Sequence, residues 1–332
     1  MGVWQAASRV ARSGHGGFGW LIACIATAFA AASAAAQPGG IARPAPETPL
    51  SIVVSVPPLK GLVEPLAPAG SKIQMLVPPG RSEHSYELTP GDLATVARAD
   101  VVVYVGLNLE PKLVQELERR PRQARQVVEF AAAAGVTGEG GCDHPDHDHA
   151  HDHDGHDHGP VDQHLWLDPA LVEKLIPQVA AAIEAALREK NAWDAAAAER
   201  LRDAQHELID QVRGVDAAYR DRLGSIKGKA IVTHHNAFGR VAERYGFTVA
   251  TAIRSFEGAE PTPGELSKVV DAIREQGVTI IYIEPQYNPA MAQRIARLAG
   301  VEIGTLDPLG DGDWFRMMRA NLDALARDGA GR

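Results

Sequence analysis

The sequence contains very little cysteine. Only Cys24 and Cys142 occur among its 332 residues, and Cys24 lies in a segment that we expect to be removed from the mature chain. A single remaining thiol cannot form an intrachain disulfide, even in an oxidising compartment. The sequence therefore predicts that the mature protein is stabilised by a packed hydrophobic core.

Long hydrophobic runs and concentrated positive charge are also scarce. Beyond the N-terminal segment, no stretch is long and apolar enough to cross a bilayer. The formal net charge is -9, and the sequence shows no basic patch of the kind that a nucleic-acid-binding face requires. We therefore expect no nucleic-acid partner.

The N-terminus has the pattern of an export signal. Arg9 and Arg12 precede an uncharged segment, residues 18–36, that closes on small residues before Gln37. A basic start, an apolar middle and a small-residue cleavage site are typical of a secretory signal peptide. We therefore expect residues 1–36 to be a signal peptide and residues 37–49 to be a proline-containing linker.

Two alternatives to this cleavage remain open. Cys24 ends the sequence Leu-Ile-Ala-Cys, which fits a lipoprotein processing box, but most of the apolar segment follows that cysteine. Cleavage after Ala36 is therefore favoured over lipid anchoring at Cys24. A membrane-spanning anchor is disfavoured by the alanine-rich, weakly apolar composition, although the length alone could span a bilayer.

Short runs rich in valine and isoleucine alternate with helical patterns along the mature chain. This alternation is typical of parallel sheets covered by helices, so we predict an α/β fold. The expected strands are Ile52–Val56, Lys72–Val77, Asp100–Val105, Lys229–Thr233, Phe247–Ala252, Val278–Ile283 and Val301–Leu306.

The two groups of strands are separated by a long helical region, residues 169–223. In its second half, from Trp193 to Leu223, apolar residues recur at spacings of three, four or seven. This pattern predicts one rigid amphipathic helix of about thirty residues, or about 45 Å. We expect an N-terminal lobe at 50–190, a linking helix at 191–223 and a C-terminal lobe at 224–332.

A histidine-rich segment interrupts the N-terminal lobe. Residues 142–158 contain seven histidines and six aspartates but no aliphatic residue larger than alanine. Such a segment cannot form a core, whereas imidazoles beside carboxylates form a flexible surface for zinc, nickel or copper. We expect a disordered loop over 138–159 that binds metal through His144, His147, His149, His151, His153, His156 and His158. The alternative is a solvated acidic loop that is merely rich in histidine.

Four further histidines lie at positions that suit a binding site. His84 follows the strand predicted to end at Val77, His234 and His235 follow the strand ending at Thr233, and Asp307 follows the last strand. His164 precedes a helix that Asp168 can cap. Ligands bind beyond the carboxyl ends of strands in open α/β sheets, so these residues are candidate metal ligands. His206, on the exposed face of the long helix, is expected to be solvated.

Five segments carry a family resemblance. They are the strings G-R-S-E-H-S-Y-E-L-T-P-G-D from Gly80, D-Q-H-L-W-L-D-P from Asp162, H-N-A-F-G-R-V-A-E-R-Y-G from His235, I-E-P-Q from Ile283 and L-D-P-L-G from Leu306. In this order and spacing the sequence resembles the ZnuA-like zinc-uptake periplasmic binding proteins of ABC transporters, from about Ile52 to Ala326. The resemblance implies a periplasmic, monomeric protein that delivers Zn²⁺ to a membrane permease. It also implies two lobes with the metal in the cleft between them.

The resemblance also implies a ligand set. The family's three histidines fall on His84, His164 and His235, its aspartate falls on Asp307, and Glu83 matches an auxiliary glutamate of some zinc members. His234 lies one position before the motif and is expected to point away.

Three imidazoles and one carboxylate suit four-coordinate Zn²⁺. Manganese members of the wider family have a glutamate in place of one histidine, which is a harder donor, whereas His235 is histidine here. The histidine-rich loop lies between His84 and His164, where many zinc members carry one. Cys142 at its edge departs from that pattern, and it could either add a soft ligand or be oxidised.

Two other classes of function are alternatives to a zinc-binding transport protein. A zinc hydrolase is disfavoured because the sequence contains no H-E-x-x-H, G-x-S-x-G or Walker motif, and because a fourth protein ligand at Asp307 would close the metal to substrate. A metal-dependent adhesin or storage protein could use the same fold, and the sequence alone does not separate such a second role from transport.

Overall fold

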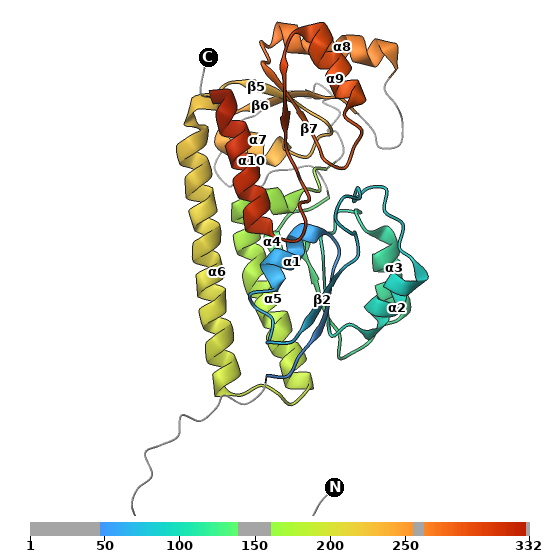
Figure 1. The fold of residues 1–332 in the computed structure, drawn as a ribbon. Helices are drawn as coiled ribbons and strands as arrows, with labels where there is room; N and C mark the ends of the chain where they lie inside the picture. Colours follow the sequence, from blue (N-terminus) through green and yellow to red (C-terminus); the bar gives the residue numbers. More distant parts are fainter. Residues whose placement is uncertain (1–46, 139–160, 255–261, 330–332) are drawn as a thin grey trace, which may run out of the picture. The chain divides into compact units, whose positions relative to one another are not determined.

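The computed structural model describes residues 47–138, 161–254 and 262–329 (Figure 1). The predicted signal peptide, most of the histidine-rich loop, and both cysteines lie outside the described residues. In the part that is described, no helix is long and apolar enough to cross a membrane.

The first half of the chain forms a parallel four-stranded sheet. Its strands run in the order β2-β1-β3-β4. The elements are β1 (Ser51–Val54), α1 (Pro57–Val63), β2 (Lys72–Met75), α2 (Pro90–Arg98), β3 (Val101–Tyr104), α3 (Pro111–Arg119), β4 (Gln126–Glu129) and α4 (Phe130–Ala134).

The second half forms another parallel four-stranded sheet, with the order β6-β5-β7-β8. Its elements are β5 (Ala230–Thr233), α7 (Gly239–Tyr245), β6 (Thr248–Ala252), α8 (Pro263–Glu275), β7 (Ile280–Ile283), α9 (Ala290–Ala299), β8 (Glu302–Thr305) and α10 (Trp314–Gly329). Counted within each half, both sheets run second, first, third, fourth. Each half therefore has a topological switch point, between β1 and β3 and between β5 and β7, where α/β sheets place ligands.

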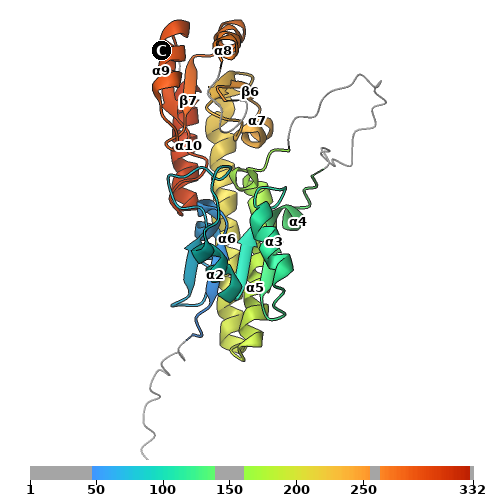
Figure 2. The ribbon, with the colours of Figure 1, turned by 90° about the vertical axis from the view of Figure 1, so that its right-hand side faces the viewer.

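Two long helices lie between the sheets in the sequence. They are α5 (Pro169–Glu189) and α6 (Ala195–Arg222), which pack side by side (Figures 1 and 2). The short 3-10 turns η1 (Leu165–Leu167) and η2 (Leu223–Ile226) flank the pair. Asp168 caps α5 by accepting a hydrogen bond from the amide of Ala170, as the sequence predicts.

The predicted linking helix is confirmed as α6. Its buried residues are Leu201, Leu208, Val212, Val215 and Tyr219, and all five belong to the predicted apolar series. His206 is exposed on this helix, as expected. The helix is amphipathic because its apolar residues pack on the protein while the remaining faces carry charge.

The seven predicted strands are all present, each within a few residues of its predicted bounds. An additional strand, β4, was not predicted from the sequence, and its four residues read Gln-Val-Val-Glu. It is an edge strand with two apolar residues, one of which, Val127, is 48% exposed. A short edge strand has no long apolar run, because only part of it is covered by the core.

Two buried tryptophans fix the segment before α5 against the end of the chain. The indole of Trp166 donates to the carbonyl of Pro308 at 2.5 Å, and the indole of Trp314 donates to the carbonyl of Trp166 at 2.7 Å. Both side chains are fully buried, so each needs such a partner for its N–H. This packing places His164, which lies two residues before Trp166, near the second sheet.

Candidate metal site

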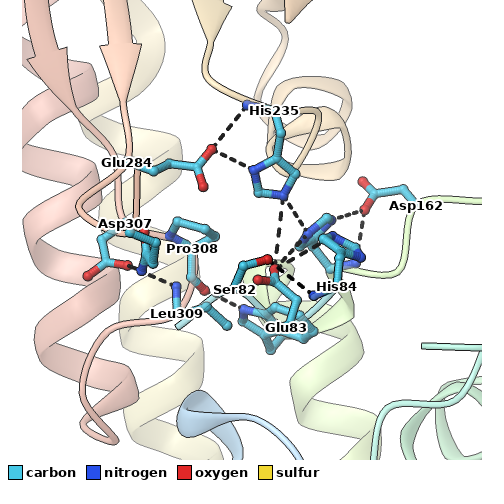
Figure 3. A network of polar contacts seen from close by, with 12 residues as sticks. Ser82, Glu83, His84, Asp162, His235, Glu284, Asp307, Pro308 and Leu309 are labelled. Atoms are coloured by element: carbon cyan, nitrogen blue, oxygen red, sulfur yellow. Dashed lines mark hydrogen bonds and ion pairs between the residues drawn. The ribbon is translucent and has the colours of Figure 1, made fainter. Parts of the chain in front are cut away.

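Four candidate ligands converge on one point. Glu83, His84, His164 and His235 each offer one ligand atom, and these atoms all lie within 4.8 Å of one another (Figure 3). They come from three separate segments: the loop after β2, the segment before α5 and the turn after β5. The fold therefore brings together all three predicted histidines and the glutamate that was expected to be auxiliary.

The spacing of the ligand atoms fits a single small ion. The Nε2 atoms of His164 and His235 are 3.0 Å apart, and Oε1 of Glu83 lies 3.2 Å from Nε2 of His164. The same oxygen lies 3.8 Å from Nε2 of His84 and 4.0 Å from Nε2 of His235. Two atoms bound tetrahedrally to one Zn²⁺ are separated by about 3.3 Å, given bonds of 2.0–2.1 Å. Small side-chain shifts would bring all four atoms into that geometry.

Two of the histidines are oriented by carboxylates. Asp162 Oδ1 lies 2.8 Å from Nδ1 of His164, and Glu284 Oε1 lies 2.6 Å from Nδ1 of His235. Each carboxylate also accepts from the backbone amide of its histidine. An ionised carboxylate only accepts hydrogen bonds, so each Nδ1 carries the proton and each Nε2 is directed toward the centre of the group. Such carboxylate–histidine pairs orient metal ligands.

The charges of the group favour a cation. Burial alone would raise the pKa of Glu83, but its hydrogen bond with His164 and the charges of the histidines lower that pKa to about 2. For His164 burial alone would lower the pKa, but Asp162 and Glu83 raise it to about 10. When no metal is bound, His164 is therefore protonated at both ring nitrogens, and its positive charge lies between Asp162 and Glu83. A divalent cation that replaces a proton of His164 meets an anionic set of ligands, of which Glu83, His164 and His235 are buried.

The orienting carboxylates have pKa shifts of opposite sign. Burial raises the pKa of Glu284, and the nearby negative charge of Glu83 adds to that shift, whereas His235 opposes it. For Asp162, burial acts to raise the pKa, but the hydrogen bond and the charge of His164 outweigh it and lower the pKa. Glu284 is therefore the less readily ionised of the two.

The group is reached from the side of His84. The side chain of His84 is 22% exposed, whereas that of Glu83 is 2% exposed. A cavity of about 310 Å³ lies beside these two residues and is also lined by Asn108 and Lys112. His84 is therefore the ligand that an incoming ion can contact first.

Asp307 lies outside this group of four. Its Oδ1 accepts a hydrogen bond from the amide of Leu309 at 3.0 Å (Figure 3). It also accepts hydrogen bonds from the amide of Gly310 at 3.0 Å and from Nε2 of Gln286 at 2.7 Å. The carboxylate thus stabilises the turn that follows β8. The role of Asp307 as fourth ligand stays a prediction, because in this arrangement Glu83 is the carboxylate that lies within 4.0 Å of the Nε2 atoms of all three histidines.

His234 is not part of the group, as the alternation along β5 predicts. It is buried, and its ring stacks on that of Tyr287 with a centroid distance of 4.3 Å and an interplanar angle of 6°. The neighbouring histidines His234 and His235 therefore have different roles.

Asp162 and Glu284 orient two of the histidines, a role that was not predicted from the sequence. Glu284 directly follows β7, so it lies at the carboxyl end of the strand adjacent to β5. That position was a usable signal, because neighbouring parallel strands end at the same edge of a sheet. Asp162 lies only two residues before His164, but loop geometry determines whether such a side chain turns back to the imidazole.

The fold and the site define a class of protein. Two α/β halves, a long connecting helix and a convergent cluster of histidines and a carboxylate are the features of a metal-binding solute-binding protein. The profile of the ZnuA family, described as zinc-uptake complex component A, periplasmic, matches residues 52–328, and the chain belongs to this family. The family consists of solute-binding transport proteins, which are not enzymes.

Two curated relatives show how far the similarity extends. The zinc-binding lipoprotein AdcA of Streptococcus pneumoniae is 26% identical over 288 residues, covering 83% of this chain and 55% of AdcA. The high-affinity zinc uptake system protein ZnuA of Yersinia pestis is 27% identical over 281 residues, covering 79% of this chain and 84% of that protein. The chain therefore spans about half the length of AdcA but most of the length of ZnuA.

A solved structure supports the fold. A crystal structure of ZnuA has a TM-score of 0.68 and 22% sequence identity, covering 85% of this chain and all of that chain. At this identity the likeness establishes the two-lobed α/β fold alone.

Proposed function

We propose that this protein captures Zn²⁺ and delivers it to the membrane permease of an ABC transporter. The observation that carries the proposal is the convergence of Glu83, His84, His164 and His235 within 4.8 Å. Three imidazoles and one carboxylate are a donor set that suits tetrahedral zinc, whereas manganese prefers more oxygen ligands. The names of the zinc-binding relatives support the same ion.

In this proposal Glu83 supplies the fourth ligand. It is buried and ionised, and its Oε1 lies within 4.0 Å of the Nε2 atoms of all three histidines, whereas Asp307 is engaged with Gln286 and with backbone amides. Asp307 would instead hold the turn after β8 in place beside the site. With four protein ligands the ion has no open position for a reacting water, which suits transport rather than hydrolysis.

The histidine-rich loop would gather zinc for the buried site. Residues 142–158 carry seven imidazoles and therefore can raise the local zinc supply. A segment whose composition predicts disorder should lose about 1–2 kcal/mol of conformational entropy for each residue fixed around an ion, so its sites should bind more weakly than a preformed pocket. We propose that it supplies zinc to the cluster or senses an excess.

The proposed transport role also implies a cellular location and an oligomeric state. An export signal over 1–36 would send the protein to the periplasm, where it would act as a monomer and dock on the permease. The lipoprotein name of AdcA makes anchoring at Cys24 the alternative to cleavage after Ala36.

A binding experiment tests the assignment of the site. The protein lacking residues 1–36 and 143–158 is purified without added metal, and its metal content is measured by elemental analysis. Zinc is then titrated in competition with manganese and with a chelator. We expect one tight zinc site, which His235→Ala abolishes and which the control His206→Ala, on the exposed face of α6, leaves unchanged. One tight zinc retained by the His235→Ala protein would contradict the assignment.

A growth experiment tests transport separately. Deletion of the gene should impair growth when zinc is chelated, and the full-length protein should restore it. The His235→Ala protein should not. If the deletion strain grows normally under chelation but loses attachment to a surface, the adhesin alternative is supported instead.

A further inference from the structure

Tyr287 lies in the loop after β7 and contacts two segments that each carry a proposed ligand. Its hydroxyl lies 3.3 Å from the hydroxyl of Ser82, the residue directly before Glu83. Its ring stacks on His234, the residue directly before His235. Ser82 and Tyr287 are 205 residues apart in the sequence, so this contact joins the loop after β2 to the second sheet.

The ring of Tyr287 is held firmly in place. The parallel ring of His234 lies against it at 4.3 Å, and His235 meets it edge-on at 6.2 Å. The guanidinium of Arg254 lies 5.4 Å from the centroid of the ring, within cation–π distance. The amide of Arg254 also donates to the carbonyl of His234 at 2.9 Å, which fixes the backbone that leads to His235.

Tyr287 is also tied to the carboxylate that orients His235. Its backbone amide donates to the carbonyl of Glu284 at 3.2 Å. The side chain of Glu284 holds Nδ1 of His235. A shift of Tyr287 would therefore disturb the support of His235 from two directions, through His234 and through Glu284.

The contact of Tyr287 with Ser82 differs in kind from the contacts among the ligands. His164 and His235 touch through their Nε2 atoms, and Glu83 touches His164 through Oε1. These are the atoms that a metal must take, so those contacts are lost when zinc binds. The contact between Tyr287 and Ser82 uses no ligand atom and is compatible with both states.

We infer that Tyr287 is a positioning residue that keeps Glu83 and His84 next to His235 before zinc arrives. This inference rests on the proposed zinc site. A set of ligands that is already assembled loses less conformational freedom when the ion binds, so affinity rises and dissociation slows. The hydroxyl of Tyr287 holds the Ser82 segment, and its ring holds the His234 segment.

The test measures zinc affinity and the rate of zinc release to a chromophoric chelator, in the protein lacking residues 143–158. Tyr287→Phe keeps the ring and removes the hydroxyl, whereas Ser82→Ala removes the partner. The two hydroxyls lie farther apart than the usual 2.7–2.8 Å, so we expect Tyr287→Phe to weaken zinc binding about 2- to 5-fold, mainly through faster release. Ser82→Ala should weaken binding at least as much, because it also removes the acceptor of the His84 amide. Tyr287→Leu, which also loses the stack on His234, should weaken binding further.

Two controls separate positioning from general stability. Tyr282→Phe removes a hydroxyl that donates to the carbonyl of Ala324 at 3.2 Å, away from the site. This control should lower the melting temperature without changing zinc release. Ser82→Ala also removes the acceptor of the His84 amide at 3.3 Å, which Tyr287→Phe leaves in place. In a double-mutant cycle, the Ser82→Ala/Tyr287→Phe protein should therefore bind zinc no more weakly than Ser82→Ala alone, because the second change removes a contact that the first has already removed.

The outcomes are distinct. The inference is overturned if Tyr287→Phe releases zinc at the rate of the unmodified protein, or if the effects of Ser82→Ala and Tyr287→Phe multiply. If the unmodified protein itself holds no tight zinc, the proposed function fails, and that result is visible before any variant is compared.

Discussion

Oε1 of Glu284 lies 2.6 Å from Nδ1 of His235, and this pair bridges the switch point of the second sheet. His235 follows β5 and Glu284 follows β7, which are neighbouring parallel strands. The same oxygen also accepts the backbone amide of His235 at 3.1 Å. The imidazole is therefore fixed in both position and tautomer by one carboxylate (Figure 3).

Replacing Glu284 with Gln should weaken zinc binding about 10- to 100-fold. The amide keeps the size of the side chain, but it removes the negative charge that raises the basicity of the imidazole and so makes His235 a stronger metal ligand. Competition with a chelator, in the protein without residues 143–158, measures the change. Glu275→Gln, at the exposed end of α8, is the matched control and should bind zinc normally. Equal affinity in the two variants would refute the role of Glu284.

Glu83 and Asp307 can be distinguished as fourth ligands by paired variants. Glu83→Gln removes a buried charge that lies 3.2 Å from Nε2 of His164. We expect zinc affinity to fall about tenfold and no further, because an amide oxygen or a water can partly replace the carboxylate as a ligand. Asp307→Asn should weaken the turn after β8 and change zinc affinity less. Chelator competition gives the affinities, and thermal unfolding gives the stabilities. If Asp307→Asn lost more zinc affinity than Glu83→Gln, the fourth position would belong to Asp307.

These two carboxylates show what the sequence can and cannot reveal about the site. The placement of His235 could be predicted because it lies just beyond the carboxyl end of β5, and the apolar run of β5 identifies that strand in the sequence. Glu83 and His84 lie in the loop after β2, and no periodic pattern specifies which way their side chains turn. Asp307 follows a strand in the same way as His235, but its carboxylate accepts backbone amides of its own turn instead.

The fold was more predictable than the site because its signals are repetitive. Every residue of β3 is buried, so the run of valines in this central strand was unambiguous. The buried positions of α6 recur with helical spacing over 28 residues. In contrast, β4 has four residues at a sheet edge, where partial exposure leaves only Val128 buried.

The stability of the metal-free protein should depend on pH through His164. Its pKa is raised from 6.5 to about 10 in the folded state, so its stabilising effect is fully present below pH 6.5 and is lost as the pH rises toward 10. Glu83, with a pKa lowered to about 2, contributes above pH 4.5 and loses its contribution as the pH falls toward 2.

The measurement is thermal unfolding in the presence of a chelator, for the unmodified protein and His164→Gln. The difference in melting temperature should be largest between about pH 4.5 and 6.5 and should shrink toward pH 10. His206→Gln, exposed on α6, should show no such trend. A difference that grows above pH 6.5 would have the wrong sign.

Zinc affinity should show the opposite dependence on pH. Zinc must replace a proton of His164. Protonation of this group alone should therefore lower the apparent zinc affinity about tenfold for each pH unit below 10. Calorimetry at pH 7 in buffers of different ionisation enthalpy should detect at least one proton released per zinc bound. Binding without proton release would show that His164 is neutral before zinc arrives.

Gly61 and Gly214 provide a matched pair for the packing of the helices. A Cβ at Gly61, in α1, would lie 2.6 Å from the amide nitrogen of Trp314 and 2.9 Å from the carbonyl oxygen of Gly312. Both are backbone atoms, so α1 and α10 would have to separate, and Gly61→Ala should be destabilising by about 1–3 kcal/mol. A Cβ at Gly214, within α6, would meet nothing within 4 Å.

Gly214→Ala should therefore be stabilising by up to about 1 kcal/mol, because alanine has the higher helix propensity and no contact opposes it. The free energies of unfolding come from urea denaturation of the metal-free proteins, so that zinc binding does not add to the values. The opposite signs of the two changes are the essential result, since both add one methyl group to a helix. If Gly61→Ala were as stable as the unmodified protein, the close approach of α1 to residues 312–314 would be incorrect.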